Sequence, residues 1–397
     1  MVVFSFAAPD ASAATSTSSF GVYRGGGNVA GVTEFEAWVG TKVTWALDFV
    51  PGATWADIES PTWAANRWAR SKYRTIYSVP LLPASGGSLR EGAAGAYNEH
   101  FRRLAQTLVA TGEGDAVLRL GWEFNGAWFR WSAAHEPAAF ASYWRQIVTT
   151  MRGVPGAAFR FDWCPILGNG AVAAERAYPG DAYVDYIGLD VYDQDWYAGW
   201  QEPSQRWKNL LTQPHGLRWH RDFATAHRKP MTFPEWGLAV RADGHGGGDN
   251  RYFIKQMHRW IDANHVAYSA YFEFDGGDGV HRLMTGRFPQ SAATFLALFG
   301  SRAAAPSRSS PALSRATPPL HKALAAITRF AARKNMRARG ARSWFRCRAT
   351  RSTAVGSVRR RTRSRRRDVL QGDRGKNRCA FRSTLARSSA RSSTTRP

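Results

Sequence analysis

The sequence predicts an α/β protein with the (β/α)8 TIM-barrel fold, followed by a disordered basic tail. Strand-like apolar runs alternate with helix-like segments eight times between residues 18 and 300, and this alternation is typical of a parallel sheet covered by helices. Eight strand–helix units in about 280 residues fit one closed barrel, for which about 250 residues is usual. A doubly wound open sheet is the alternative fold.

The expected strands cover residues 20–23, 43–50, 75–82, 116–124, 158–166, 186–192, 231–238 and 266–274. Helices are expected in the gaps between them. The clearest one spans residues 88–109, because Ser88 and Glu91 form a capping-box pattern at its start and Gly112 follows its end. The starts of four others are expected after Glu136, Gln205, Asn250 and Pro289.

The charge is divided unequally along the chain. Of the 54 Lys and Arg residues, 27 lie in residues 301–397, where the only acidic residues are Asp368 and Asp373. Residues 1–300 are therefore near neutral, with 27 basic and 28 acidic residues. The formal net charge of +24 describes the tail, and it does not indicate that the folded part binds nucleic acid or a membrane.

We expect the tail, residues 301–397, to be disordered. Ser, Arg, Ala and Pro dominate it, and its apolar residues keep neither the helix period nor the strand period. Two explanations of this Arg-rich composition are open. A basic arm would bind nucleic acid or an anionic polymer through salt-sensitive contacts. The 24 Arg against three Lys instead favour translation of a GC-rich gene out of frame.

Residues 1–19 are expected to be a leader or a truncated signal peptide. An apolar run over residues 2–8 is followed by Ala11, Ser12 and Ala13, like the end of a secretory signal, although no Lys or Arg precedes Arg24. We therefore expect the protein to be secreted or periplasmic. No stretch of the sequence approaches the ~18 to 20 apolar residues of a membrane span.

Two glutamates are expected at the carboxyl ends of strands, where barrel enzymes place their chemistry. The strand period of two puts Arg119, Gly121 and Glu123 on one face of the fourth strand, and Glu235 on the same face as Phe233 in the seventh. Both glutamates lie among aromatic and small residues, where a carboxylate is costly unless it is paired or used. Glycoside hydrolysis requires two such carboxylates, one that protonates the leaving oxygen and one that attacks the anomeric carbon.

Tryptophans gather around the same strand ends. Flat apolar rings with an N–H edge stack well on sugar rings, although about half of this group would serve equally as packing. The group consists of Trp122, Trp128, Trp131, Trp196, Trp200 and Trp236.

Three segments, in their order and spacing, resemble glycoside hydrolase family 26, the β-mannanase type of retaining barrel: RLGWEFNGAWFRW, YPGDAYVDYIGLDVYD and PEWG. The resemblance covers residues 20–300 and none of the tail. It implies that Glu123 is the acid/base, that Glu235 is the nucleophile, and that Tyr192 contacts the nucleophile. It also implies that Trp128 stacks on a sugar ring, and that Arg119 is the family's arginine in the strand before the acid/base glutamate. The other candidate substrate-binding residues are Trp122, Asn125, Trp131, Asp190, Trp196 and Trp236.

The resemblance implies a retaining endo-glycoside hydrolase that cleaves a β-linked polysaccharide by double displacement, with no metal and no cofactor. One departure concerns specificity. Mannanases of the family usually have His immediately before the acid glutamate, whereas this chain has Trp122, which offers one N–H donor and no acceptor. The substrate therefore stays open among mannan, xylan, mixed-linkage glucan and a bacterial exopolysaccharide.

Two other functions are compatible with parts of the sequence. The first is a barrel that binds carbohydrate without turnover, against which the presence of both glutamates speaks. The second is a nucleotide-binding oxidoreductase, because residues 25–30 fit the pattern G-x-G-x-x-A and Asp48 follows about 20 residues on.

Overall fold

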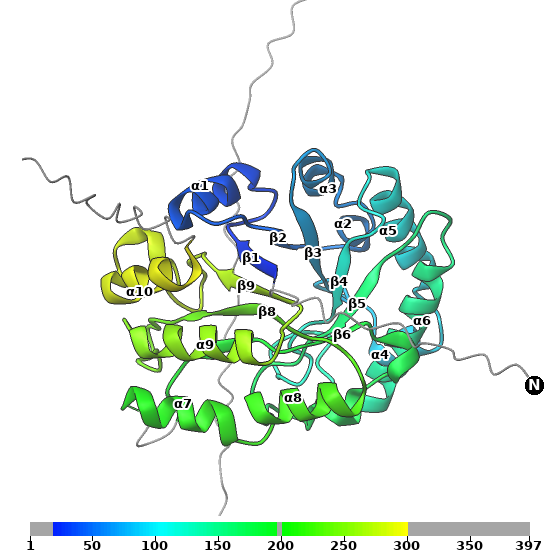
Figure 1. Cartoon of the computed structure of the whole chain (residues 1–397). Coiled ribbons are helices and arrows are strands. Elements are labelled where there is room, and N and C mark those ends of the chain that lie inside the picture. Colours follow the sequence, from blue (N-terminus) through cyan, green and yellow to red (C-terminus); the bar gives the residue numbers. More distant parts are fainter. Residues whose placement is uncertain (1–18, 197–200, 301–397) are drawn as a thin grey trace, which may run out of the picture. The chain divides into compact units, whose positions relative to one another are not determined.

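The computed structural model describes residues 19–196 and 201–300, which include every expected strand (Figure 1). Residues 1–18, Trp200 and the basic tail lie outside the described residues. The observed strands are β1 (Ser19–Tyr23), β2 (Trp45–Phe49), β3 (Arg74–Val79), β4 (Val117–Leu120), β5 (Arg160–Trp163), β6 (Tyr186–Gly188), β7 (Val191–Asp193), β8 (Met231–Leu238) and β9 (Tyr268–Phe272).

The strands of the described residues form one parallel sheet in the order β6-β5-β4-β3-β2-β1-β9-β8-β7. β6 also pairs with β8, which closes the sheet into a barrel. β6 and β7 are two halves of one barrel strand, because both pair with β8 and only residues 189–190 separate them. The predicted eight-stranded (β/α)8 barrel is therefore confirmed, and the open-sheet alternative is wrong.

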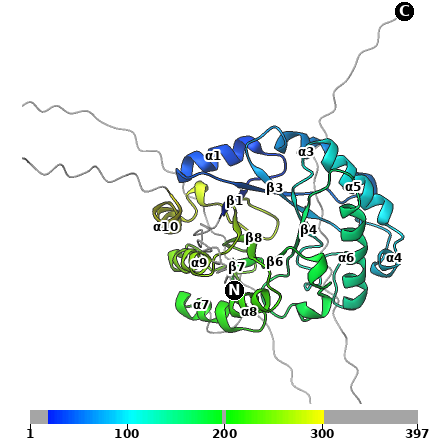
Figure 2. The same ribbon diagram turned by 45° about the vertical axis from the view of Figure 1, so that its right-hand side comes forward.

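Helices surround the barrel on its outside (Figures 1 and 2). They are α1 (Val29–Val39), α2 (Trp55–Glu59), α3 (Thr62–Trp68), α4 (Leu89–Ala93), α5 (Asn98–Ala110), α6 (Pro137–Arg152), α7 (Pro203–Thr212), α8 (Leu217–Ala226), α9 (Arg251–Ala263) and α10 (Pro289–Phe299), with short 3-10 turns at Ala174–Ala177, Asp181–Tyr183 and Leu283–Thr285. The starts of α6, α9 and α10 agree with the expected ones.

The helix expected over residues 88–109 is divided into α4 and α5. Its predicted cap is present, because Ser88 Oγ accepts the Glu91 N–H at 3.2 Å and donates to the Glu91 carboxylate at 2.8 Å. The chain leaves the helix near Gly95, which has a φ of 87°, in the left-handed region that favours glycine. The single-helix prediction is therefore wrong at this glycine.

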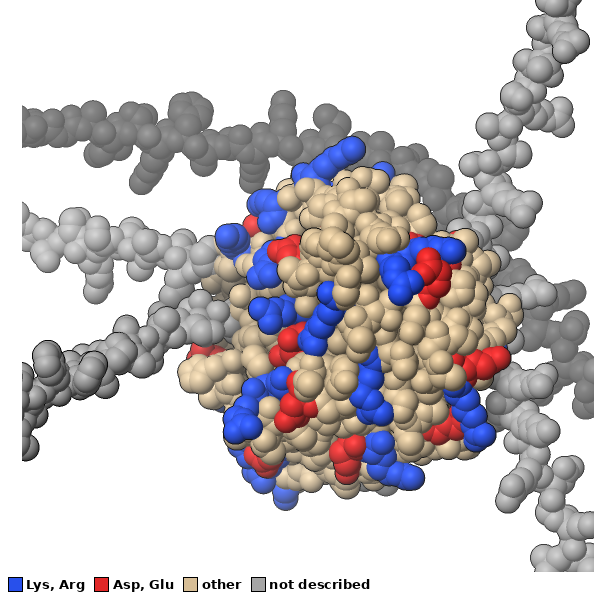
Figure 3. Space-filling model, turned by 90° about the vertical axis from the view of Figure 1, so that its right-hand side faces the viewer, with Lys and Arg blue, Asp and Glu red and all other residues tan. Residues whose placement is uncertain are grey.

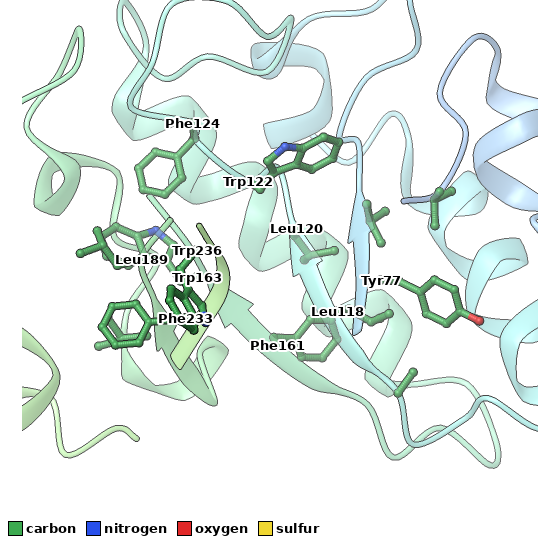
Figure 4. Packing of buried hydrophobic residues seen from close by; sticks show 14 of the residues in the cluster. Tyr77, Leu118, Leu120, Trp122, Phe124, Phe161, Trp163, Leu189, Phe233 and Trp236 are labelled. Atoms are coloured by element: carbon green, nitrogen blue, oxygen red, sulfur yellow. The ribbon is translucent and has the colours of Figure 1, made fainter. Parts of the chain in front are cut away.

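The hydrophobic core has two layers. The larger layer joins the outer face of the sheet to the helices and includes Phe161, Trp163, Phe233 and Trp236 (Figure 4). The smaller one fills the barrel and consists of Tyr23, Trp45, Leu47, Ile76, Val117, Tyr268 and Ala270. The barrel is thus a packed scaffold, and the residues at the carboxyl ends of its strands are held in fixed positions.

The surface agrees with a near-neutral domain. On the face in Figure 3, Lys and Arg side chains are interspersed with Asp and Glu. No helix within residues 19–196 and 201–300 is long and apolar enough to cross a membrane.

Candidate active site

Glu123 lies in a turn beyond the end of β4 and not on the strand. β4 stops at Leu120 because Gly121 has a φ of 51°, which extended backbone does not allow. Glu123 has a φ of 52°, a rare conformation for a residue with a side chain and one that clusters at functional sites. Its N–H donates to the Cys164 carbonyl at 2.9 Å. The expected strand alternation through Arg119, Gly121 and Glu123 is therefore wrong.

Glu235 points into the barrel because β8 contains a bulge. β8 pairs with β9 at Phe233 and again at Trp236, but the two partner residues on β9 are only two positions apart, so β8 has one extra residue there. Phe233 contacts His220 of α8 and Trp236 contacts Phe253 of α9, so both side chains point outward. The prediction that Glu235 shares a face with Phe233 is wrong, because the bulge puts them on opposite faces.

Arg119 of β4 is fully buried and holds Glu235 in place. Its Nε donates to Ser78 Oγ at 3.0 Å, its Nη1 to Asp190 Oδ1 at 2.9 Å, and its Nη2 to Glu235 Oε1. The Tyr192 hydroxyl donates to Glu235 Oε2 at 2.8 Å. Both carboxylate oxygens of Glu235 are thus engaged, one of them by a permanent cation, and the orientation of the group is fixed.

Asp190 reaches Arg119 because the sixth barrel strand is interrupted between β6 and β7. The buried Asp190 also accepts a hydrogen bond from the Cys164 thiol, with 3.1 Å between Sγ and Oδ1. Burial raises the pKa of Asp190, and the positive charge of Arg119 opposes that rise. Asp190 therefore acts on Glu235 through Arg119.

The carboxyl group of Glu123 lies in a different environment. It is half-buried, and one of its oxygens accepts a hydrogen bond from Trp128 Nε1 at 2.8 Å. Burial raises the pKa of Glu123, the negative charge of Glu235 raises it further, and the Trp128 N–H and the Arg119 charge act in the opposite direction. The net direction is upward, so Glu123 keeps its proton at a pH where an ordinary glutamate has lost it.

A cavity of about 340 Å³ lies beside this carboxylate cluster and is bounded by two exposed tryptophans. Trp128 is 56% exposed and Trp196 is 45% exposed. Trp196 is held by its stacking on His245, with 4.4 Å between ring centroids, and by the Arg241 guanidinium 5.0 Å from its ring. The cavity is lined by Trp128, Ile166, Leu167, Gly168, Asn169, Gly170, Asp190, Tyr192, Gln194, Trp196, Leu210 and Gln213. Exposed indoles around a polar floor are suited to sugar rings.

Three candidate substrate-binding residues do not reach the cavity. Asn125 is buried, and its side-chain amide accepts the Ile166 N–H at 2.8 Å and donates to the Ile166 carbonyl at 2.9 Å, so it fastens the loop after β5. Trp131 is buried and donates to the Trp122 carbonyl at 2.9 Å. Trp236 is completely buried between the sheet and the helices. Packing and backbone contacts occupy the polar and apolar surfaces of these residues, and the structure assigns them to the frame of the site; their contact with substrate stays a prediction.

An arc of aromatic rings surrounds the barrel mouth, and we call its members the mouth aromatics: Tyr23, Phe49, Trp122, Tyr192 and Phe272. Sequence reasoning named Trp122 and Tyr192 and missed the other three. Their ring centroids follow one another at 4.9 Å (Tyr23 and Phe49), 5.3 Å (Phe49 and Trp122), 4.9 Å (Tyr23 and Phe272) and 5.8 Å (Phe272 and Tyr192). Three of them are the last residues of β1, β2 and β9. That position was a usable signal, because barrel active sites form at the ends of strands.

The dinucleotide-binding interpretation is wrong. Asp48 Oδ2 accepts the Gly27 N–H at 2.8 Å and the Trp68 Nε1–H, so the acidic residue and the glycine turn of the proposed fingerprint bind each other. The fold is a closed barrel and not the open sheet that this motif requires. Among the described residues, no group of three or more His, Cys, Asp or Glu side chains is arranged to hold a metal ion.

A closed (β/α)8 barrel with one glutamate just beyond its fourth strand and a second, electrostatically coupled one in the bulge of its seventh has the arrangement of a glycoside hydrolase. The sequence model of glycosyl hydrolase family 26 matches residues 98–210 of the chain, a segment that includes Glu123 and Tyr192. The resemblance to glycoside hydrolase family 26 that the motifs predict is therefore confirmed.

Two curated relatives match part of the chain. A mannan endo-1,4-beta-mannosidase of Bifidobacterium adolescentis is 28% identical over 200 residues, which is 45% of this chain and 18% of the relative. Endoglucanase H of Acetivibrio thermocellus is 27% identical over 179 residues, or 41% of this chain and 18% of the relative. The matched region thus spans about a fifth of each relative's length.

Solved structures share the barrel. A Cellulomonas fimi endo-beta-1,4-mannanase double mutant superposes with a TM-score of 0.55 at 19% identity and covers 72% of each chain. The catalytic domain of a Bacillus sp. JAMB-750 endo-beta-1,4-mannanase gives a TM-score of 0.50 at 18% identity, with 71% of this chain and 85% of that chain covered. At these identities the similarity establishes the fold.

Proposed function

We propose that the protein is a retaining endo-acting glycoside hydrolase of β-linked polysaccharides, with Glu123 as acid/base and Glu235 as nucleophile. The observation that carries this proposal is the opposed environment of the two glutamates. Glu235 is oriented by Arg119 and Tyr192, while burial and the charge of Glu235 raise the pKa of Glu123. One group is thus prepared to attack and the other to donate a proton, which is the division of roles that double displacement requires.

The reaction balances with these two groups alone. Glu235 attacks the anomeric carbon and forms a glycosyl ester, while Glu123 gives its proton to the leaving glycosidic oxygen. Glu123, now ionised, takes a proton from a water molecule that attacks the same carbon, and the ester bond to Glu235 breaks. Each displacement inverts the configuration at the anomeric carbon, so the two together retain it.

The substrate is proposed to bind across the barrel mouth, with one part in the cavity between Trp128 and Trp196. One curated relative is named as a mannan endo-1,4-beta-mannosidase and the other as an endoglucanase. Mannan and β-glucan are therefore the first candidate substrates, and xylan and a bacterial exopolysaccharide are the next. Trp122 lies in the mouth and is 9% exposed as a residue. Within the described residues its indole N–H has no hydrogen-bond partner in the protein, which leaves one donor and no acceptor there for a sugar.

The test is release of reducing ends from mannan, xylan, mixed-linkage glucan and an exopolysaccharide by the full-length protein. We expect oligosaccharides from at least one of them, and no release by Glu235→Gln. A matched control is Glu113→Gln, because Glu113 is a buried glutamate that precedes β4 at the opposite end of the barrel. If the wild-type protein binds a polysaccharide but releases no reducing ends, the barrel binds carbohydrate without turnover and the proposal fails.

We further propose that the leader expected over residues 1–19 ends before Ser19, the first residue of β1, and that the enzyme acts outside the cytoplasm, because a polysaccharide too large to cross a membrane must be cleaved where it lies. Expression in a secreting host, followed by mass spectrometry of the mature amino terminus in the medium, tests this. Retention of the whole chain in the cytoplasm would contradict it.

A further inference from the structure

Tyr23 is a residue of the barrel mouth to which neither the family motifs nor the two-glutamate mechanism assigns a role. It is the last residue of β1 and belongs to the cluster inside the barrel. Its ring is fixed from three sides, by Phe49 at 4.9 Å, Phe272 at 4.9 Å and Phe274 at 5.3 Å between centroids. The side chain is 91% buried, with 9% of its surface exposed, so its hydroxyl has little freedom to move.

The neighbours of Tyr23 place it beside the carboxylate cluster. The Phe49 ring lies 5.6 Å from the Arg119 guanidinium carbon, and the Phe272 ring lies 5.8 Å from that of Tyr192. Arg119 and Tyr192 are the two residues that hold Glu235. The negative charges of Asp48 and Glu235 both act on Tyr23 and, after burial, are the causes that raise its pKa.

The Tyr23 hydroxyl has no hydrogen-bond partner among the residues that the structure describes, and it is not one of the fully enclosed polar atoms. The nearby acceptors are already engaged. Glu235 accepts from Arg119 and Tyr192. Asp48 accepts from Gly27, from Trp68 and from its neighbour's backbone N–H. The Tyr23 O–H is therefore rigidly held, reachable from the mouth and free of a partner in the described part of the protein, so the group that pairs with it is water or a molecule that enters the mouth.

We propose that the Tyr23 hydroxyl is a substrate-binding group that donates a hydrogen bond to a ring hydroxyl of the sugar seated against Glu235. The inference rests on the proposed hydrolase function and adds a residue to it. Trp122 supplies an indole N–H where mannanases of the family usually have His, so this position offers a donor and no acceptor, and Tyr23 adds a hydroxyl that can do both. Tyr23 then contributes to the choice of sugar, since a substrate without a hydroxyl at that position leaves the Tyr23 O–H unpaired.

Tyr23→Phe tests this, because it removes one oxygen atom and keeps the ring contacts. We expect kcat/KM on the preferred polysaccharide to fall about 5- to 20-fold. The melting temperature should stay within about 2 °C of wild type, because the hydroxyl makes no hydrogen bond inside the protein. The matched control is Tyr73→Phe, whose hydroxyl donates to Glu36 at 2.9 Å between α1 and the start of β3, and which should leave kcat/KM unchanged.

A set of aryl glycosides, each lacking one ring hydroxyl, identifies the contact. We expect the kcat/KM of the wild-type enzyme to be lower for one deoxy substrate than for the complete glycoside. On that substrate Tyr23→Phe should have the same kcat/KM as wild type, whereas on every other substrate it should be lower than wild type. A Tyr23→Phe enzyme with wild-type kcat/KM on every substrate would overturn the inference and leave the hydrolase proposal intact, whereas an inactive wild-type protein would refute the hydrolase proposal itself.

A second measurement covers the case in which Tyr23→Phe folds poorly. In a crystal structure of full-length Glu235→Gln with a bound oligosaccharide, the Tyr23 hydroxyl should lie 2.5–3.0 Å from a sugar hydroxyl. A separation beyond about 3.5 Å from every sugar oxygen would overturn the inference.

Discussion

The hydrogen bond from Trp128 to Glu123 gives a prediction about the pH dependence of the reaction. Trp128 Nε1 donates to Glu123 Oε2 at 2.8 Å, and this bond favours the ionised form of the carboxyl group and so lowers its pKa. Trp128→Phe removes the N–H donor and keeps a flat ring for the sugar. The pKa of Glu123 should therefore rise, and the proton that the acid needs should persist to higher pH.

The size of the effect follows from the exposure of the donor. A hydrogen bond to a charged group contributes about 1.5–3 kcal/mol when it is shielded from water. Trp128 is 56% exposed, so solvent competes for the bond and about 1 kcal/mol is a reasonable value. Since 1.36 kcal/mol corresponds to one pKa unit, the alkaline limb of the kcat/KM profile should move upward by about 0.7 pH unit.

The assay is kcat/KM from pH 4 to 10 on the preferred polysaccharide, with wild type and Trp128→Phe side by side. Trp131→Phe is the matched control, because it also removes an indole N–H, which donates at 2.9 Å to the Trp122 carbonyl and not to a carboxyl group. Its alkaline limb should coincide with that of wild type. An alkaline limb of Trp128→Phe that stays in place or moves to lower pH would refute the assignment of Glu123 as the acid under the control of Trp128.

Three further predictions concern the buried cation, the two glutamates and the domain boundary. Arg119→Gln leaves two carboxylates without their cation and should lower the free energy of unfolding by about 3–5 kcal/mol at pH 7. Urea titrations should show a smaller loss near pH 4 and a growing one as pH rises, because burial raises the pKa of Asp190, Arg119 opposes that rise, and without Arg119 the folded variant keeps a proton on Asp190 that the unfolded chain gives up; an equal loss at both pH values would contradict this. Initial rates should show Glu235→Ala inactive on every substrate, and Glu123→Ala about 10²- to 10⁴-fold slower on polysaccharide but active on an aryl glycoside with a good leaving group; equal losses of both variants on that glycoside would contradict the division of roles. A chain truncated after Gly300 should fold and keep full activity on soluble substrate, because α10 ends at Phe299, and should lose any low-salt affinity of the whole chain for DNA or anionic polymer; an insoluble product would put the boundary elsewhere.

The number of strands and the approximate positions of their ends were predictable, because apolar runs of the right length alternate with amphipathic segments. The direction of the side chains at those ends was not. Counting by twos assumes an unbroken strand, and both glutamates lie where the strand is broken: Glu123 after a left-handed Gly121, and Glu235 in the bulge of β8. The bulge also explains why Trp236 belongs to the core, since it points to the face opposite Glu235.

Contacts between distant segments were also beyond the sequence pattern. Asn125 follows the acid glutamate closely, yet its amide binds the backbone of Ile166, 41 positions away. Tyr23 ends a strand of five residues, and nothing local indicates that its ring is enclosed by Phe49 and Phe272. These placements depend on which strands are neighbours: the Asn125 contact on the pairing of β4 with β5, and the enclosure of Tyr23 on the pairing of β1 with β2 and β9.

The most direct test of the two-glutamate account is to trap the glycosyl–enzyme intermediate. A 2-deoxy-2-fluoro glycoside with a good leaving group, made from the sugar that the polysaccharide panel identifies, slows the second displacement more than it slows the first. Mass spectrometry should then show one fluorosugar bound per chain, on the peptide that contains Glu235. A label on another residue, or an unlabelled active enzyme whose first product has the inverted anomeric configuration, would contradict the account.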